Sequence, residues 1–165
     1  HMIMLTVVNE RTEHTLPFVM SLPVSSRDYT IAKMVANLGV VLVPWLVIVI
    51  ASIGWILARS WLPDGLLPFA IIMLLHMLLG YCLLLAVALI SESLAWTVVA
   101  IVFNNIAIQA VMYISSNIPS IKQHLLTENI VWSPAAIALI VGHIGLIVCL
   151  LVLTITVQNR KRDFI

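Results

Sequence analysis

The chain has 165 residues, of which 62% are hydrophobic and only 9% are charged. Soluble domains carry about 25% charged residues, so this composition excludes an ordinary soluble globular domain and indicates an integral membrane protein. The net charge of +1 gives no broad positive field, which argues against nucleic acid as a partner. Cys82 and Cys149 lie inside apolar runs, where a free thiol behaves as a small hydrophobic group, so cysteine usage does not identify a compartment.

The first part of the chain predicts an elbow on the membrane surface, over residues 9–33. Thr15 can cap a short amphipathic helix that Pro23 ends. Ser25 followed by Asp28 is a capping-box pattern, which predicts a second helix that begins near Ser26 and continues into the first span. Such a bent pair of helices could transmit force from a soluble partner, although a passive interfacial anchor has the same pattern.

Four long apolar runs without charge follow the elbow. Each has 21 to 25 residues, enough for a helix to cross the ~30 Å hydrocarbon core. The runs are too long for barrel strands and lack their alternation, so we expect an all-α transmembrane helical bundle. The predicted spans are Met34 to Ala58, Leu66 to Ile90, Leu94 to Ile114 and Ala135 to Val157.

The positions of the basic residues predict the orientation. Six of the eight lysines and arginines lie before the first run or after the last one. Because four spans return the chain to the side on which it started, the positive-inside rule predicts that both termini are cytoplasmic. These six residues are Arg11, Arg27, Lys33, Arg160, Lys161 and Arg162.

The connections between the runs differ in length. Residues 61–65 predict a tight external turn, in which Gly65 is free to adopt a positive φ. The three residues 91–93 join the second and third runs into an antiparallel hairpin. In the longer external loop, Ile121 and Leu125 share one face of a short helix that starts at Pro119, and we expect this helix to lie in the outer interface.

Polar residues interrupt the third run near its middle. Asn105 and Gln109 are four residues apart and share a helix face, and Asn104 lies beside them. An amide without a partner in hydrocarbon is costly, so these side chains should face other helices or line a wet pathway. In the fourth run, Gly142 and Gly145 are expected to allow close approach of another helix.

Two histidines lie within the spans at similar depth. His76 is ten residues into the second run and His143 eight residues into the fourth, counted from the external ends. The ordinary interpretation is that these histidines form hydrogen bonds between helices or line a substrate pathway. A second hypothesis is that the two imidazoles ligate one haem between facing helices, as in a membrane cytochrome.

The amino-acid sequence of the elbow resembles that of a known protein family. It is similar to the cytoplasmic loop between the second and third spans of ATP-binding-cassette (ABC) transporter permeases of the type 2 exporter class, with Asp28 where that family frequently has glutamate. The similar residues are Asn9-Glu10-Arg11, Thr15-Leu16, Ser21 to Ser25, Arg27-Asp28-Tyr29, Lys33 and Asn37.

This resemblance implies a permease subunit of an ATP-driven exporter in a prokaryotic plasma membrane. Residues 3–8 would be the end of the second span, and the four runs would be the third to sixth. The family has a dimeric translocation unit, formed with an identical or a different permease subunit, and a separate ABC ATPase that binds ATP and Mg²⁺. The chain itself would then bind no cofactor and catalyse nothing, which agrees with its lack of a phosphate-binding GxxxxGK[ST] motif. The residues expected to couple to the ATPase are Glu10, Arg11, Leu16, Phe18, Leu22, Arg27 and Asp28.

A third hypothesis is a membrane protein that keeps the permease architecture without driving export, such as an immunity or assembly factor. It would show no nucleotide-dependent association with an ATPase.

Overall fold

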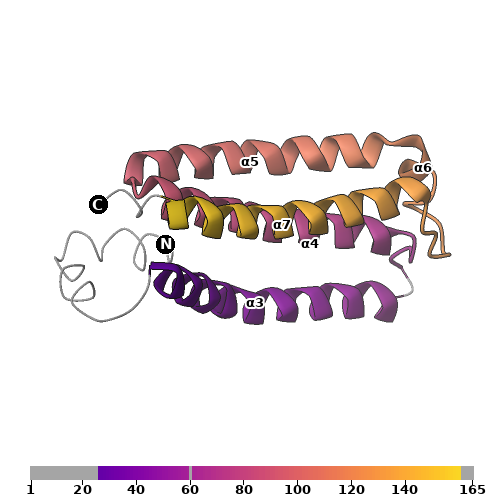
Figure 1. Cartoon of the computed structure of the whole chain (residues 1–165). Helices are drawn as coiled ribbons and strands as arrows, with labels where there is room; N and C mark the ends of the chain where they lie inside the picture. The colour runs from indigo at the N-terminus through magenta and orange to yellow at the C-terminus, as the bar shows by residue number, and fades with distance from the viewer. Residues whose placement is uncertain (1–25, 60, 161–165) are drawn as a thin grey trace.

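A computed structural model describes residues 26–59 and 61–160 of the chain. These residues form five helices and no strand (Figure 1). The helices are α3 (Ser26–Ala58), α4 (Leu66–Ser91), α5 (Leu94–Asn117), α6 (Pro119–Lys122) and α7 (Pro134–Arg160). All except α6 are long and apolar enough to cross a membrane. The prediction of an all-α bundle with four spans is therefore confirmed, and the chain is a multi-pass membrane protein.

Helix α3 begins at Ser26, where the capping-box pattern predicts a helix start, and continues without a break through Pro44. Its 33 residues correspond to a length of about 50 Å, which exceeds the ~30 Å hydrocarbon core. One end of the helix therefore extends beyond the part that a bilayer would enclose. The helix predicted between Thr15 and Pro23 lies outside the described residues.

Helix α4 lies at the centre of the bundle, between α3, α5 and α7 (Figure 1). Of the residues in its most apolar window, 44% are buried, against 6% in α3, 6% in α5 and 11% in α7. Helix α4 is no more apolar than α3 or α7, so packing and not composition distinguishes the central helix. Each of the other three exposes at least half of its large apolar side chains, as lipid-facing helices do.

Two clusters of buried residues hold the ends of the bundle. At the end where α4 meets α5, Met34 of α3 packs against Leu85, Ala88 and Leu89 of α4. At the other end, Ile72 of α4 is fully buried against loop and α7 residues. The start of α3 and the end of α7 lie at the first end, and α6 lies at the second (Figure 1).

The two tight turns form where the sequence predicts them. Glu92 ends α4 with a left-handed φ of 53°, and its backbone N–H donates to the Ala88 carbonyl. The prediction for Gly65 was wrong, because its φ is −61°. A glycine is needed there for another reason: a Cβ on Gly65 would lie 1.9 Å from the backbone oxygen of His124 in the distant loop.

The loop between α5 and α7 contains a short helix, as predicted, but α6 has only four residues. Ile121 in α6 is buried, and Leu125, which follows the end of α6, is half-buried against the core, while Lys122 and Gln123 are exposed and His124 is half-buried. The loop is fixed to the bundle by a hydrogen bond from the Gly65 N–H to the Thr127 carbonyl. It therefore closes one end of the bundle.

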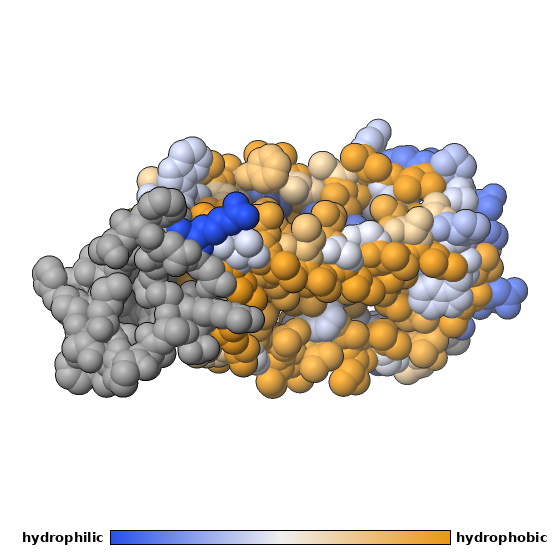
Figure 2. Space-filling view, in the orientation of Figure 1, coloured by the Kyte–Doolittle hydropathy of each residue, from blue (hydrophilic) through white to orange (hydrophobic). Residues whose placement is uncertain are grey.

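The surface of the bundle differs between its middle and the end that carries α6. Hydrophobic residues cover the middle of the bundle, and hydrophilic residues gather at the end that carries α6 (Figure 2). This distribution is the one expected when the middle faces hydrocarbon and the end faces water and headgroups. It agrees with the four candidate spans.

Candidate functional site

A buried contact between two histidine side chains joins α4 to α7. His76 Nδ1 lies 3.2 Å from His143 Nε2, and the two rings meet edge to face at a centroid distance of 5.4 Å. Each histidine is only 7% exposed. The prediction that these residues lie at the same depth is confirmed, and the structure shows that they touch.

The neighbouring backbone fixes the direction of the hydrogen bonds when both rings are neutral. His143 Nδ1 lies 2.7 Å from the Leu139 carbonyl, which can only accept, so this nitrogen carries the proton. His143 Nε2 is then an acceptor, and His76 Nδ1 donates to it. His76 Nε2 is left as a buried acceptor for which the described residues supply no donor.

The geometry of the pair bears on the haem hypothesis. A haem ligated by both residues would place its iron and macrocycle between the two ring nitrogens. At 3.2 Å these nitrogens are at hydrogen-bond distance, so the rings do not fit a haem in this arrangement. The contact has the geometry of an interhelical hydrogen bond.

The amides of the third span divide between two surfaces. Asn104 lies against the backbone of α4, because a Cβ on Gly80 would come within 2.3 Å of Asn104 Oδ1. Gly80 is thus where the two helices approach closely. The prediction for Gly142 and Gly145 is not met within the described part of the chain, where both are exposed and a Cβ on either would meet no described atom within 4 Å.

Asn105 and Gln109 contact neither another described helix nor a buried pathway. Both side chains are exposed on α5. Asn105 Nδ2 donates to the carbonyl of Ile101 in its own helix, 2.8 Å away, which leaves its Oδ1 free to accept. The expectation that these amides face other helices is therefore not met within the described part of the chain.

Other polar side chains join the helices at points that sequence reasoning missed. The indole Nε1 of Trp45 in α3 donates to the Leu74 carbonyl in α4, and the hydroxyl of Tyr81 in α4 donates to the Asn37 carbonyl in α3. At the end of α7, Gln158 Nε2 donates to the Leu89 carbonyl. Their sequence signal was weak, because Trp45 and Tyr81 are single residues with one polar atom inside apolar runs and Gln158 directly follows the last run.

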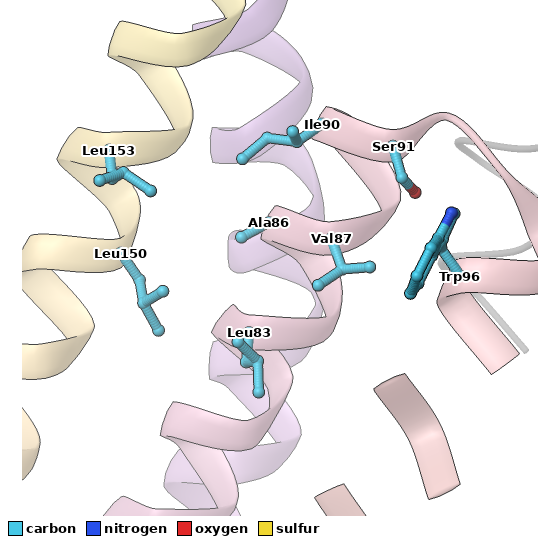
Figure 3. A pocket seen from close by; sticks show the side chains of 8 residues that line it. All are labelled: Leu83, Ala86, Val87, Ile90, Ser91, Trp96, Leu150 and Leu153. Carbon is cyan, nitrogen blue, oxygen red and sulfur yellow. The ribbon is translucent and has the colours of Figure 1, made fainter. Parts of the chain in front are cut away.

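An apolar groove of about 340 Å³ lies between α4, α5 and α7, near the turn at Glu92. Figure 3 shows aliphatic side chains along it, with the Ser91 hydroxyl and the Trp96 indole at one end. This lining offers an aliphatic chain many dispersion contacts but offers no charged group to an ionic ligand. No group of three metal-ligating side chains occurs within residues 26–59 and 61–160.

The predicted coupling residues fall mainly outside the described residues, which exclude Glu10, Arg11, Leu16, Phe18 and Leu22. Arg27 and Asp28 belong to the first turn of α3. They therefore occupy the end of the continuous helix that the elbow prediction requires.

Comparisons with known proteins give no relative: no protein-family model, curated protein or solved structure matches the chain.

Proposed function

We propose that the chain is the membrane-spanning permease subunit of an ATP-driven exporter in a prokaryotic plasma membrane, with both of its termini cytoplasmic. A separate ABC ATPase would bind ATP and Mg²⁺, and the translocation unit would contain two permease subunits. The resemblance of residues 9–37 to the coupling loop of type 2 exporters supports this proposal.

The observation that carries the proposal is the continuity of α3. A single helix of 33 residues joins Arg27 and Asp28, at one end, to the apolar residues of the first span. Because backbone hydrogen bonds hold the turns of an α-helix together, a push on its first turn would be passed along the residues that precede Pro44, the position at which this helix bends most readily. This is the connection that a coupling elbow needs.

The weak attachment of α3 to the other helices also supports a moving part. Its side chains meet α4 at the Trp45 and Tyr81 hydrogen bonds and in the cluster around Met34, and most of its other large apolar residues are exposed. Few buried contacts oppose a tilt of α3 relative to the rest of the bundle.

The test uses the full-length protein and the ABC ATPase that this proposal requires as its partner. Replacing Leu16 and Leu22 with aspartate places two charges on the apolar face of the elbow. Since central apolar anchors contribute most of an interface's binding energy, we expect the dissociation constant for the ATPase to rise about 30-fold or more, with loss of stimulated ATP hydrolysis.

The matched control is Leu126→Asp, which adds the same charge at a side chain that is 84% exposed in the loop after α6. This variant should bind the ATPase as the wild type does. Unchanged binding and hydrolysis in the Leu16 and Leu22 variants would refute the proposal. A wild-type protein that shows no nucleotide-dependent association would instead support an immunity or assembly protein.

A further inference from the structure

Two apolar grooves adjoin on the surface of α7, toward the end of the bundle where α4 meets α5. The first is the groove of about 340 Å³ between α4, α5 and α7 (Figure 3). The second, of about 510 Å³, follows α7 from Gly145 to Arg160, and all the residues that line it belong to α7. Leu153 lines both grooves and is 50% exposed, so it forms a ridge between them.

The second groove is hollow because small side chains follow one face of α7. Gly145, Cys149 and Thr156 are four and seven residues apart, which places them on the same side of the helix. The larger Val148 and Leu153 flank them. The Thr156 hydroxyl donates to the Val152 carbonyl of its own helix, 2.8 Å away, so its hydrogen is not offered to the groove.

Both grooves run from about mid-span to the same end of the bundle. Gly145 is the twelfth of the 27 residues of α7, and fifteen residues separate it from Arg160, a rise of about 22 Å. That length is about half of the 40–45 Å that a bilayer spans with its headgroups. The first groove extends from Leu83 to Ser91, in the last third of α4. The two grooves therefore occupy the depth of one leaflet.

Hydrogen-bond donors and a positive charge lie where the grooves end. Gln158 of α7 donates to the Leu89 carbonyl of α4, which places Arg160 and Ser91, each two residues further on, at about the same level. Arg160 is exposed. The Ser91 hydroxyl and the Trp96 indole lie at this end of the first groove (Figure 3).

We propose that the two grooves bind one diacyl phospholipid with an anionic headgroup. One acyl chain lies in each groove, on either side of the Leu153 ridge, and the phosphate lies beside the Arg160 guanidinium. The Trp96 N–H and the Ser91 hydroxyl are at the level of the ester and phosphate oxygens, to which they can donate. The lipid would hold α7 to α4 and α5 in one leaflet.

The charge at the end of the grooves favours this lipid over a protein helix. In a bilayer, apolar helix surfaces gain little from associating, and the residues between Gly145 and Val157 offer a partner helix no amide or charge. Arg160 is followed in the sequence by Lys161, Arg162 and Asp163, so this segment has a net positive charge. A flexible acyl chain also fills a narrow groove beside a ridge, where it makes many dispersion contacts.

The first test is native mass spectrometry of the full-length protein with palmitoyl-oleoyl phosphatidylglycerol or the phosphatidylcholine that has the same chains. The wild type should bind the first phosphatidylglycerol about fivefold or more tightly than the first phosphatidylcholine. Since a basic residue near the headgroups contributes about 1 kcal/mol with an anionic lipid, Arg160→Gln should lower this preference about fivefold.

Lys122→Gln is the matched control, because it removes an exposed cation at the opposite end of the bundle. It should leave the preference of the first bound lipid unchanged. An Arg160→Gln variant with the wild-type preference would overturn the proposed headgroup contact. A wild type that binds both lipids equally would overturn the inference, because the grooves would then hold bulk lipid or a protein segment.

The second test addresses the acyl chains. Gly145→Leu places a side chain in the second groove and should raise the dissociation constants of both lipids about threefold or more, with little change in their ratio. Gly142→Leu is the control, since Gly142 is an exposed glycine of the same helix that does not line either groove. Equal effects of the two substitutions would overturn the chain-binding part of the proposal. Neither test involves an ATPase, so the inference stands or falls separately from the proposed function.

Discussion

Each imidazole ring inside a membrane brings two nitrogens that need partners. The contact between His76 and His143 and the Leu139 carbonyl together provide partners for three of the four nitrogens. The contact lies at the largest helix–helix interface in the described chain, between α4 and α7. The contribution of this hydrogen bond to stability depends on both histidines, because removal of one ring would leave the facing nitrogen of the other unpaired in an apolar interface.

The pair predicts a specific pattern in a double-mutant cycle. His143→Phe removes the acceptor for His76 Nδ1 and should lower the free energy of unfolding by about 1–3 kcal/mol. Replacing both histidines with phenylalanine removes donor and acceptor together and should cost less than the sum of the single changes. Steric-trap unfolding in bicelles measures these energies, and additive effects would show that the hydrogen bond does not couple the helices.

The polar residues inside the spans show which side-chain positions the sequence can predict and which it cannot. Counting along the runs places His76 and His143 at one depth, because the rise per residue is fixed. It cannot place them in contact, since rotation of each helix about its axis is set by packing. The same limit explains Asn105 and Gln109: their shared face follows from four-residue spacing, but its outward direction does not.

At the scale of elements, the helix ends follow local chemistry. Ser133 begins α7 by accepting a hydrogen bond from the Ala136 N–H, as an N-cap residue does. Helix α5 runs three residues past its predicted end at Ile114, because Ser115, Ser116 and Asn117 bond back to carbonyls of the preceding turn. Hydropathy alone stops at the first polar residue and therefore underestimates such helices.

The junction between α4 and the α6 loop gives a prediction for one glycine. Gly65→Ala adds a methyl group that would lie 1.9 Å from a backbone oxygen, so the loop must move away and the Gly65 to Thr127 hydrogen bond is strained or lost. We expect a loss of about 1–3 kcal/mol, measured by thermal unfolding in detergent. Gly142→Ala, where a Cβ meets none of residues 26–59 and 61–160 within 4 Å, is the control and should not destabilise.

At the scale of the whole molecule, the number of spans and their approximate limits could be predicted, because run length and the absence of charge decide both. The central position of α4 could not, because all four spans are strongly apolar and only packing separates them. The buried small residues Gly80, Ala86 and Ala88 mark that position in the structure. Small residues indicate close packing only when the neighbouring helices are known, and composition does not specify the neighbours.

The proposed function requires that the elbow and the start of α3 lie on the cytoplasmic side, where a soluble ATPase could reach them. Impermeant thiol labelling of intact cells tests it in a background without Cys82 and Cys149. Arg27→Cys at the start of α3 should react only after permeabilisation, and Leu126→Cys in the opposite loop should react in intact cells. Labelling of Arg27→Cys from outside intact cells would place the start of α3 on the external side and refute the proposed coupling to an ATPase.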